Sequence, residues 1–162
     1  MDTDTRDTRT VLVVDDNPAI VALLHTVFAA EGYRVITALA REAVPSAREW
    51  QPAVILLDIS MPELDGVQVC ERLRADPATA SIPVIALSAQ LNLHLHGGAM
   101  EADAHVAKPF DVSALVEMVA TWAGRRSEHA TTRVRRPIML QQPAHTHSAL
   151  RERLATTGAA VE

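Results

Sequence analysis

The chain has 162 residues, of which 20 are acidic and 15 basic, so its formal net charge is −5. Hydrophobic residues make up 48% and aromatic residues 3%, which allows one ordinary domain with an aliphatic core. Cys70 is the only cysteine and no apolar run is long enough to span a membrane, which excludes a disulfide framework and a transmembrane helix. The acidity disfavours nucleic-acid binding by the whole surface, and residues 1–10 lack the apolar stretch of a secretory signal, so we expect a cytoplasmic protein.

Three short apolar runs are typical of strands that are buried on both faces of a parallel sheet. They cover residues 11–14, 53–57 and 83–87, and each is followed by a polar side chain or ends next to one. Residues 34–37 and 104–107 are weaker candidates for two further strands.

Apolar residues at helical spacing separate these runs. The first helix is expected to begin after Asn17, an N-cap residue, and to end at Gly32. Residues 39–50 and 64–75 predict the second and third helices, and a last helix is expected to run from Asp111 to just before Gly124. Five strands alternating with helices predict a doubly wound α/β domain with right-handed crossovers.

The charge changes sign along the chain. Residues 1–124 contain 17 acidic and 8 basic side chains, whereas residues 125–162 contain 3 acidic and 7 basic ones. We therefore expect an N-terminal extension at 1–9, a folded domain at 10–124, and a basic, largely disordered tail at 125–162.

Polar side chains gather where the predicted strands end. In a doubly wound sheet, ligands bind beyond the carboxyl ends of the strands, where Asp15, Asp16, Asp58, Ser88 and Lys108 are expected to meet. Three neighbouring carboxylates repel one another unless a cation joins them, and a site of hard oxygen ligands suits Mg²⁺. A carboxylate there could attack phosphorus and form an acyl phosphate, which a lysine and a hydroxyl would stabilise. Lys108 is the only lysine among the basic residues, and it would supply a compact charge on a flexible stem.

Four segments in order, VLVVDDNP, VILLDISMPELDG, IPVIALSA and HVAKPF, resemble the receiver domain of two-component response regulators. The resemblance covers about residues 10–124 and implies a flavodoxin-like sheet of five parallel strands in the order 2-1-3-4-5. It implies a single-domain regulator similar to the chemotaxis regulators, which receives a phosphoryl group from a sensor histidine kinase or a histidine phosphotransfer protein. Its output would be altered binding to a downstream protein. Such a domain catalyses its own phosphotransfer and autodephosphorylation, and it is not an enzyme acting on an external metabolite.

The resemblance also assigns roles around the metal. Asp58 would be the phospho-accepting aspartate and, with Asp15, Asp16 and the backbone carbonyl of Ser60, would form the Mg²⁺ site. Asp16 would ligate the ion directly, and Asp15 would orient it mostly through water. Gly66 would close the loop that follows Asp58.

On the other side of the site, the resemblance implies that Ser88 forms a hydrogen bond with the phosphoryl group and that Lys108 forms an ion pair with it. Ser88 would act as a switch residue, and the peptide before Pro109 would be cis. The side chains of Ser60 and Gln90 fall where the family tunes the lifetime of the acyl phosphate.

Two features depart from the family pattern. His105 stands where the family has an aromatic switch residue, so it would either switch as a tyrosine does or add sensitivity to pH. The 20-residue interval from Ser88 to Lys108 is shorter than in the common pattern, and a pair of glycines weakens any helix over residues 91–98. We therefore expect an altered fourth helix, short or displaced, on the family's usual output face.

Alternative functions remain open at this stage. The arginines Arg133, Arg135 and Arg136 could make the chain a transcription regulator that contacts DNA through its tail. A receiver that binds its partner constitutively, without phosphorylation, is another alternative. An aspartyl-phosphate phosphohydrolase is disfavoured, because Ser60 occupies the position where those enzymes place a second acid. Whether phosphorylation also produces a homodimer stays open.

Overall fold

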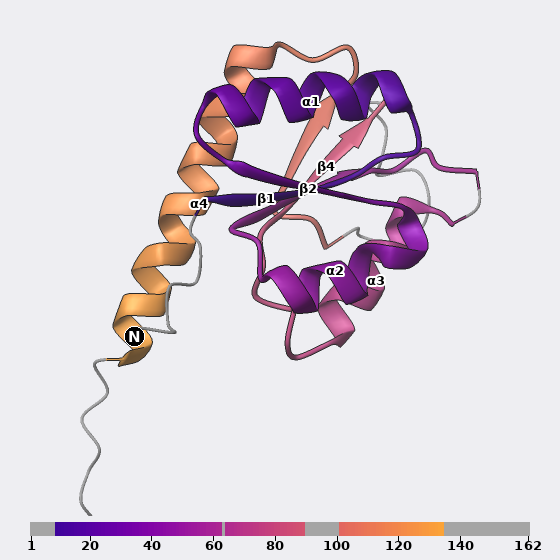
Figure 1. The fold of residues 1–162 in the computed structure, drawn as a ribbon. Coiled ribbons are helices and arrows are strands. Elements are labelled where there is room, and N and C mark those ends of the chain that lie inside the picture. Colours follow the sequence, from indigo (N-terminus) through magenta and orange to yellow (C-terminus); the bar gives the residue numbers. More distant parts are fainter. Residues whose placement is uncertain (1–8, 63, 90–100, 135–162) are drawn as a thin grey trace, which may run out of the picture.

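A computed structural model of the chain describes residues 9–62, 64–89 and 101–134. Five parallel strands form one sheet in the order β2-β1-β3-β4-β5, which confirms the predicted flavodoxin-like topology (Figure 1). The strands are β1 (Thr10–Val14), β2 (Arg34–Ala38), β3 (Val54–Asp58), β4 (Val84–Ser88) and β5 (Ala104–Ala107).

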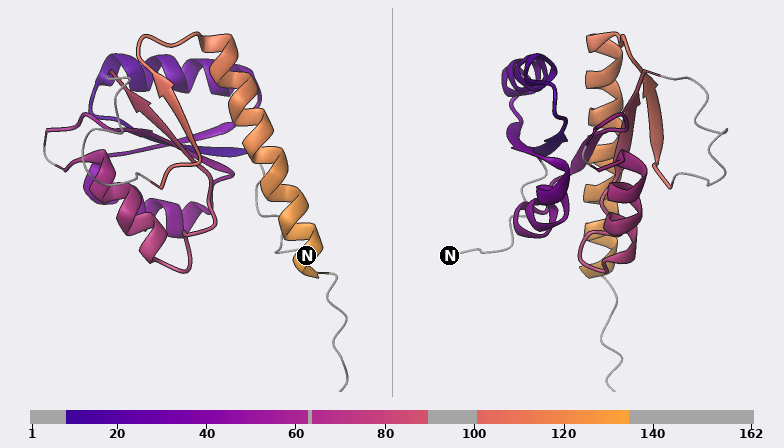
Figure 2. Two further views of the ribbon diagram at one scale, coloured as in Figure 1. Left: turned by 180° about the vertical axis from the view of Figure 1, so that it is seen from behind. Right: turned by 90° about the vertical axis from the view of Figure 1, so that its right-hand side faces the viewer.

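Two layers of helices enclose the sheet (Figures 1 and 2). The helices α1 (Pro18–Ala30) and α4 (Val112–Val134) cover one face. The other face is covered by α2 (Ala43–Trp50), which follows the 3₁₀ turn η1 (Ala40–Glu42), and by α3 (Gly66–Ala75). The three central strands, β1, β3 and β4, therefore pack between helices, as their uninterrupted apolar runs predict.

Successive side chains along a strand point to opposite faces of the sheet, so the hydrophobic core has two parts, one under each layer of helices. In β1, Val11 and Val13 face α1 and α4, whereas Leu12 and Val14 face α2 and α3. Every residue of β1, β3 and β4 is buried. The helices contribute small or aliphatic side chains to this core together with one ring, namely Leu24, Phe28, Ala43, Ala47, Val69, Leu73, Leu115 and Val119.

Local signals explain where the first and third helices begin. The Asn17 side chain accepts a hydrogen bond from the Ala19 N–H at 3.0 Å and so caps α1. The Asp65 side chain accepts one from the Val67 N–H at 3.1 Å and caps α3. After α1, Gly32 adopts a positive φ of 83°, which a residue with a Cβ rarely adopts.

The last helix is longer than predicted, and this corrects part of the predicted tail. It does not end before Gly124 but continues to Val134, so the first ten residues of the 125–162 segment are helical. Glycine inside a helix costs only about 1 kcal/mol, which packing and anchoring contacts can offset. The Arg126 guanidinium donates hydrogen bonds to the Pro52 carbonyl and, at 3.1 Å, to Gln51 Oε1, and so ties the extension to the body of the domain.

Several predicted features lie outside the described residues. These are the N-terminal extension apart from Arg9, the altered fourth helix expected at 91–98, and the tail from residue 135. Within the described ranges, no helix has both the length and the apolar character needed to cross a bilayer.

Candidate functional site

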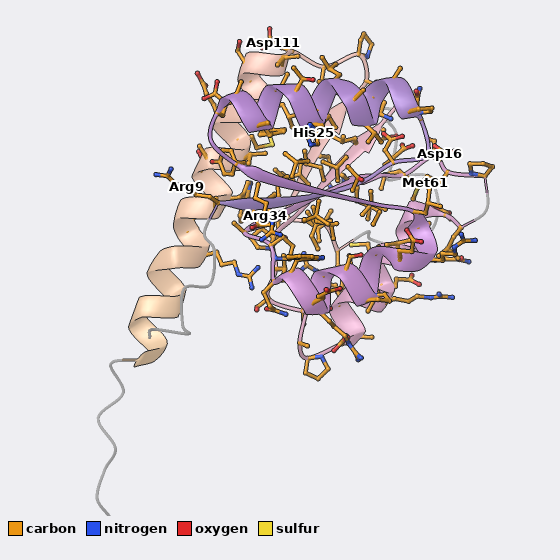
Figure 3. All side chains as sticks on the ribbon, viewed as in Figure 1. Arg9, Asp16, His25, Arg34, Met61 and Asp111 are labelled. Atoms are coloured by element: carbon orange, nitrogen blue, oxygen red, sulfur yellow. The ribbon has the colours of Figure 1, made fainter. Side chains whose placement is uncertain are left out.

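The sheet brings the predicted polar residues to one end, where the strands finish. Asp15 and Asp16 follow β1, Asp58 and Ser88 are the last residues of β3 and β4, and Lys108 follows β5. Figure 3 shows Asp16 and Met61 at this end of the molecule and Arg9 and Arg34 at the opposite end.

Three carboxylates and one ammonium group form the centre of this site. One carboxylate oxygen from each of Asp15, Asp16 and Asp58 lies within 4.8 Å of the others. The Lys108 Nζ lies 3.1 Å from Asp15 Oδ2 and 3.3 Å from Asp58 Oδ1. The lysine therefore bridges the two buried carboxylates, and residues from three distant parts of the sequence meet as predicted.

Backbone amides fix the orientation of the two buried carboxylates. The Asn17 N–H donates to Asp15 Oδ1 at 2.8 Å, and the Ser60 N–H donates to Asp58 Oδ1 at 3.1 Å. Asp15 and Asp58 are each only 3% exposed, whereas Asp16 is exposed to solvent. The carboxylates thus line a site that is anchored on its inner side and open at Asp16.

Burial raises the pKa of Asp15 above its ordinary value, because a charged carboxylate loses hydration there. The Asn17 N–H and the Lys108 ammonium oppose this effect and lower the pKa, while the negative charge of Asp58 raises it. The effect of burial is the larger one, so the charged form of Asp15 is less favoured here than in water. A further cation at the site would favour that form.

The donor set fits Mg²⁺. The ion prefers hard oxygen ligands and keeps several waters, and here three carboxylates face one another with one ammonium as their counter-charge. Asp15, Asp16 and Asp58 are the residues that would hold it. Ser60 lies two residues after the end of β3, and its role as a carbonyl ligand remains a prediction.

The loop after Asp58 passes so close to α3 that only glycine fits at its closing position. A Cβ on Gly66 would lie 2.4 Å from the Asp58 carbonyl oxygen and 2.6 Å from the Ile59 Cα. The Gly66 N–H donates to the Ile59 carbonyl at 3.2 Å. Gly66 therefore holds the backbone of the predicted phospho-acceptor in place through close approach.

The other predicted residues are placed as follows. Ser88 is buried at the end of β4, and its carbonyl accepts a hydrogen bond from the Lys108 N–H at 2.7 Å. The Lys108–Pro109 peptide is cis, as the resemblance implied. His105 is exposed on the edge strand β5, and its switching role remains a prediction. Gln90 lies outside the described residues.

One supporting residue was missed by the sequence analysis. The Arg74 guanidinium donates to Asp103 Oδ2 at 2.6 Å and to the backbone carbonyls of Glu101, Ala80 and Ile82 at 2.9 to 3.0 Å. The same Asp103 oxygen accepts the Val84 N–H at 2.8 Å. This contact fixes the start of β5, the strand that delivers Lys108. Its only sequence signal is a basic residue at the end of a helix, which is common on surfaces.

Comparison with known proteins identifies relatives for most of the chain. The model of the response regulator receiver domain matches residues 11–120. The chain is 38% identical over 112 residues to the DNA-binding dual master transcriptional regulator RpaA of Synechocystis, which covers 67% of this chain and 46% of that protein. It is 40% identical to the transcriptional regulatory protein PrrA of Mycobacterium tuberculosis, over 82% of this chain and 57% of the relative. The chain thus spans about half of the length of these regulators.

Shorter proteins match over nearly their whole length. The polar-differentiation response regulator DivK of Brucella abortus is 34% identical over 72% of this chain and 98% of its own. Among solved structures, the receiver domain of a sensor histidine kinase from Pseudomonas aeruginosa superposes with a TM-score of 0.64 and 30% identity. That alignment covers 72% of this chain and 98% of the other, whose structure has a magnesium ion coordinated in its active-site cleft.

Proposed function

Because the chain belongs to the response regulator receiver domain family, we propose that it accepts a phosphoryl group on Asp58 in a Mg²⁺-dependent reaction. Receiver domains are signalling domains and not classical enzymes. The donor would be a sensor histidine kinase or a histidine phosphotransfer protein, and phosphorylation would change the binding of a protein partner.

One observation carries this proposal. Lys108 Nζ bridges Asp15 and Asp58, within hydrogen-bonding distance of Asp15 and 3.3 Å from Asp58, at a cluster of three carboxylates. Asp58 is the only one of the three that ends a central strand and is bonded by the amide of the loop that Gly66 closes. Asp58 shares a fixed orientation and the adjacent Lys108 ammonium with Asp15, and only Asp58 adds a place at the end of a central strand, on the loop that Gly66 closes.

Each residue of the site would have a separate role in the transfer of the phosphoryl group. A carboxylate oxygen of Asp58 would form a bond to phosphorus while the bond from phosphorus to the donor histidine nitrogen breaks, and that nitrogen keeps the electron pair. Lys108 would move from its bridging position to the phosphoryl oxygens, and the Ser88 hydroxyl would donate a hydrogen bond to them. Mg²⁺ bound by Asp15, Asp16 and Asp58 would neutralise part of the phosphoryl charge.

The same contacts suggest how the signal would leave the site. Ser88 and Lys108 sit at the ends of neighbouring strands and are joined by the 2.7 Å hydrogen bond between their backbones. A phosphoryl group that attracts both side chains would therefore pull on β4 and β5 together. His105 on β5 would respond to that shift, and the partner would bind this edge. Ser60 and Gln90 would tune the lifetime of the acyl phosphate.

The test is phosphorylation of the full chain with acetyl phosphate and Mg²⁺, followed by intact mass. A single phosphoryl adduct is expected, and it should be absent from Asp58→Asn. Glu71→Gln, which removes an exposed carboxylate from α3, is the matched control and should be phosphorylated normally. Folded protein that gains no adduct at any donor concentration would contradict the proposal and favour a constitutive binding module.

A further inference from the structure

One guanidinium connects the segments that lead into β4 and β5. Arg74, in the last turn of α3, donates through Nη1 to the carbonyls of Ala80 and Ile82 at 2.9 and 3.0 Å. Its Nε donates to the Glu101 carbonyl at 2.9 Å, and its Nη2 donates to Asp103 Oδ2 at 2.6 Å. The Arg74 side chain is only 16% exposed, so these acceptors replace most of the water around it. A single side chain therefore ties the loop before β4 to the residues before β5.

Asp103 links the residue that precedes β5 to the first residue of β4 in two ways. Its backbone N–H donates to the Val84 carbonyl at 2.9 Å, and its Oδ2 accepts the Val84 N–H at 2.8 Å. The same Oδ2 accepts the hydrogen bond from Arg74. Hydrogen bonds to charged groups are stronger than those between neutral groups, so this link is stronger than an ordinary backbone hydrogen bond of the sheet. Arg74 thus holds the carboxylate against Val84, and the pairing of the two strands begins at a fixed residue.

The strand β5 depends on such an anchor, because its own side chains specify its pairing weakly. It is an edge strand of four residues, two of which are alanines, and none of its residues is fully buried. Every residue of its neighbour β4 is buried. A strand whose side chains pack little has a weakly specified register, and a slip by one residue turns each side chain to the other face of the sheet. The hydrogen bonds at the start of β5 therefore contribute strongly to its register.

This register determines where the two phosphoryl-binding groups lie. At the other end of the strands, Ala107 pairs with Ser88, and the Lys108 N–H donates to the Ser88 carbonyl at 2.7 Å. The Lys108 Nζ then lies 3.3 Å from Asp58 Oδ1. A shift of β5 by one residue would move Lys108 by about 3.3 Å along the strand. The ammonium would lose its place beside Asp58, and the backbone contact with Ser88 would break.

We propose that Arg74 is a positioning residue for phosphotransfer, because through Asp103 it fixes the register of β5 against β4. It thereby holds Ser88 and Lys108 level with Asp58, and this inference rests on the proposed function. The carboxylates of the metal site stand at the ends of β1 and β3, whereas the acceptors of Arg74 lie next to β4 and β5. The anchor therefore acts on the phosphoryl-binding groups and leaves the metal-binding groups unchanged.

The first test follows Lys108 directly by nuclear magnetic resonance. Because Lys108 is the only lysine, [¹⁵N]lysine labels one backbone amide in the full chain. Hydrogen exchange at this amide should be about tenfold faster in Arg74→Ala and in Asp103→Ala, because the pairing of β5 opens more often. Asp103→Asn should stay near the parent, since an amide oxygen can accept the hydrogen bonds from Arg74 and Val84. Unchanged exchange in both alanine variants would overturn the proposal, whether or not the chain is phosphorylated.

The second test separates phosphotransfer from metal binding. Formation of the adduct with acetyl phosphate and Mg²⁺, followed by intact mass over time, should slow by about tenfold to a hundredfold in Arg74→Ala and Asp103→Ala, because groups that contact the phosphoryl oxygens are misplaced. Asp103→Asn should restore most of the rate. The affinity for Mg²⁺ alone, measured by isothermal titration calorimetry, should not weaken in any of these variants. A loss of Mg²⁺ affinity that parallels the loss of rate would indicate general loosening of the domain and overturn the proposal.

Two other arginines provide matched controls. Arg72 is exposed on α3, two residues before Arg74, and Arg48 on α2 forms an ion pair with Asp76 at the start of the loop before β4. Arg72→Ala and Arg48→Ala should both be phosphorylated at the parent's rate, even where Arg48→Ala lowers the thermal midpoint. Equal slowing in Arg48→Ala and Arg74→Ala would contradict a specific role for Arg74. A parent chain that gains no adduct would contradict the proposed function, and the exchange at Lys108 would then decide the role of Arg74 in strand register by itself.

Discussion

At the scale of single residues, the position of Lys108 explains why one lysine stands among 14 arginines. Its Nζ reaches two carboxylates from different strands at 3.1 and 3.3 Å, on a side chain that is 20% exposed. A guanidinium is wider and presents a rigid fork, so it would meet one carboxylate in two places more readily than bridge two. The ammonium can also leave this position for a phosphoryl group without reorienting a plane.

We therefore expect Lys108→Arg to fold but to switch poorly. The formation of the phosphoryl adduct should slow by about tenfold to a hundredfold, because a donor to the developing charge is misplaced. Its thermal midpoint should stay near that of the parent. Intact mass over time with acetyl phosphate and Mg²⁺, together with a thermal melt, measures both quantities. An unchanged rate would show that position 108 needs only a positive charge.

Asp15 yields a prediction about pH. Its folded pKa is raised by burial, so the folded protein binds the Asp15 proton more tightly than the unfolded chain does. Without Mg²⁺, this residue therefore contributes a loss of stability as pH rises from the ordinary aspartate pKa through the raised one. Asp15→Asn should remove that contribution and melt a few degrees higher than the parent in EDTA at neutral pH.

With Mg²⁺ bound, we expect the parent to melt at a higher temperature than Asp15→Asn. A ligand that binds only the folded state stabilises it by about 2.7 kcal/mol at a hundredfold excess over its Kd. The parent should gain most of that stabilisation, and Asp15→Asn should gain far less because a carboxylate is missing. Thermal melts at several pH values, with EDTA and with Mg²⁺, test both the prediction for the metal-free protein and the prediction for the Mg²⁺-bound protein. If Asp15→Asn melts below the parent in EDTA, the carboxylate stabilises the empty site and the burial argument is wrong.

At the scale of elements, two glycines in helices illustrate opposite constraints. Gly66 begins α3 against the Asp58 backbone, where an added Cβ would lie 2.4 Å from a carbonyl oxygen. Gly124 lies inside α4, where an added Cβ would meet nothing within 4 Å. The first glycine is required by close packing, and the second is only tolerated by its helix.

We expect Gly66→Ala to lower the free energy of unfolding by about 1–3 kcal/mol, because the backbone of the site must shift. Gly124→Ala should raise it by up to about 1 kcal/mol, because alanine favours the helix. Urea unfolding followed by circular dichroism measures both changes. Destabilisation by Gly124→Ala would mean that α4 does not run continuously through this position.

The same elements show what the sequence can and cannot predict. The central strands β1, β3 and β4 were predictable because burial on both faces leaves an uninterrupted apolar pattern, whereas β2 and β5 gave a weaker signal. Asp15, Asp58 and Lys108 were predictable because they stand where predicted strands end. The continuation of α4 past Gly124 was not, because Arg126 is anchored by Gln51 and Pro52, more than 70 residues away. Arg74 was missed for a related reason, since three of its acceptors are backbone carbonyls, which have no sequence signal.

At the scale of the whole molecule, both helical layers depend on the same strands. Neighbouring residues of β1, β3 and β4 point alternately into the α1/α4 layer and the α2/α3 layer, and all are buried. Loss of either layer would expose one face of an aliphatic sheet to water. The carboxylate site at one end of the strands and the loops at their other end should therefore belong to one cooperative unit.

The two tryptophans allow a direct measurement of that cooperativity, because Trp50 belongs to α2 and Trp122 to α4. In Trp122→Phe the remaining fluorescence reports the α2/α3 layer, and in Trp50→Phe it reports the α1/α4 layer. Within each variant, the urea midpoint from fluorescence should coincide with that from far-ultraviolet circular dichroism, as in a two-state domain. If fluorescence of Trp122 changed at lower urea than circular dichroism while that of Trp50 did not, the α1/α4 layer would unfold separately, and the two ends of the molecule would not be held by a single core.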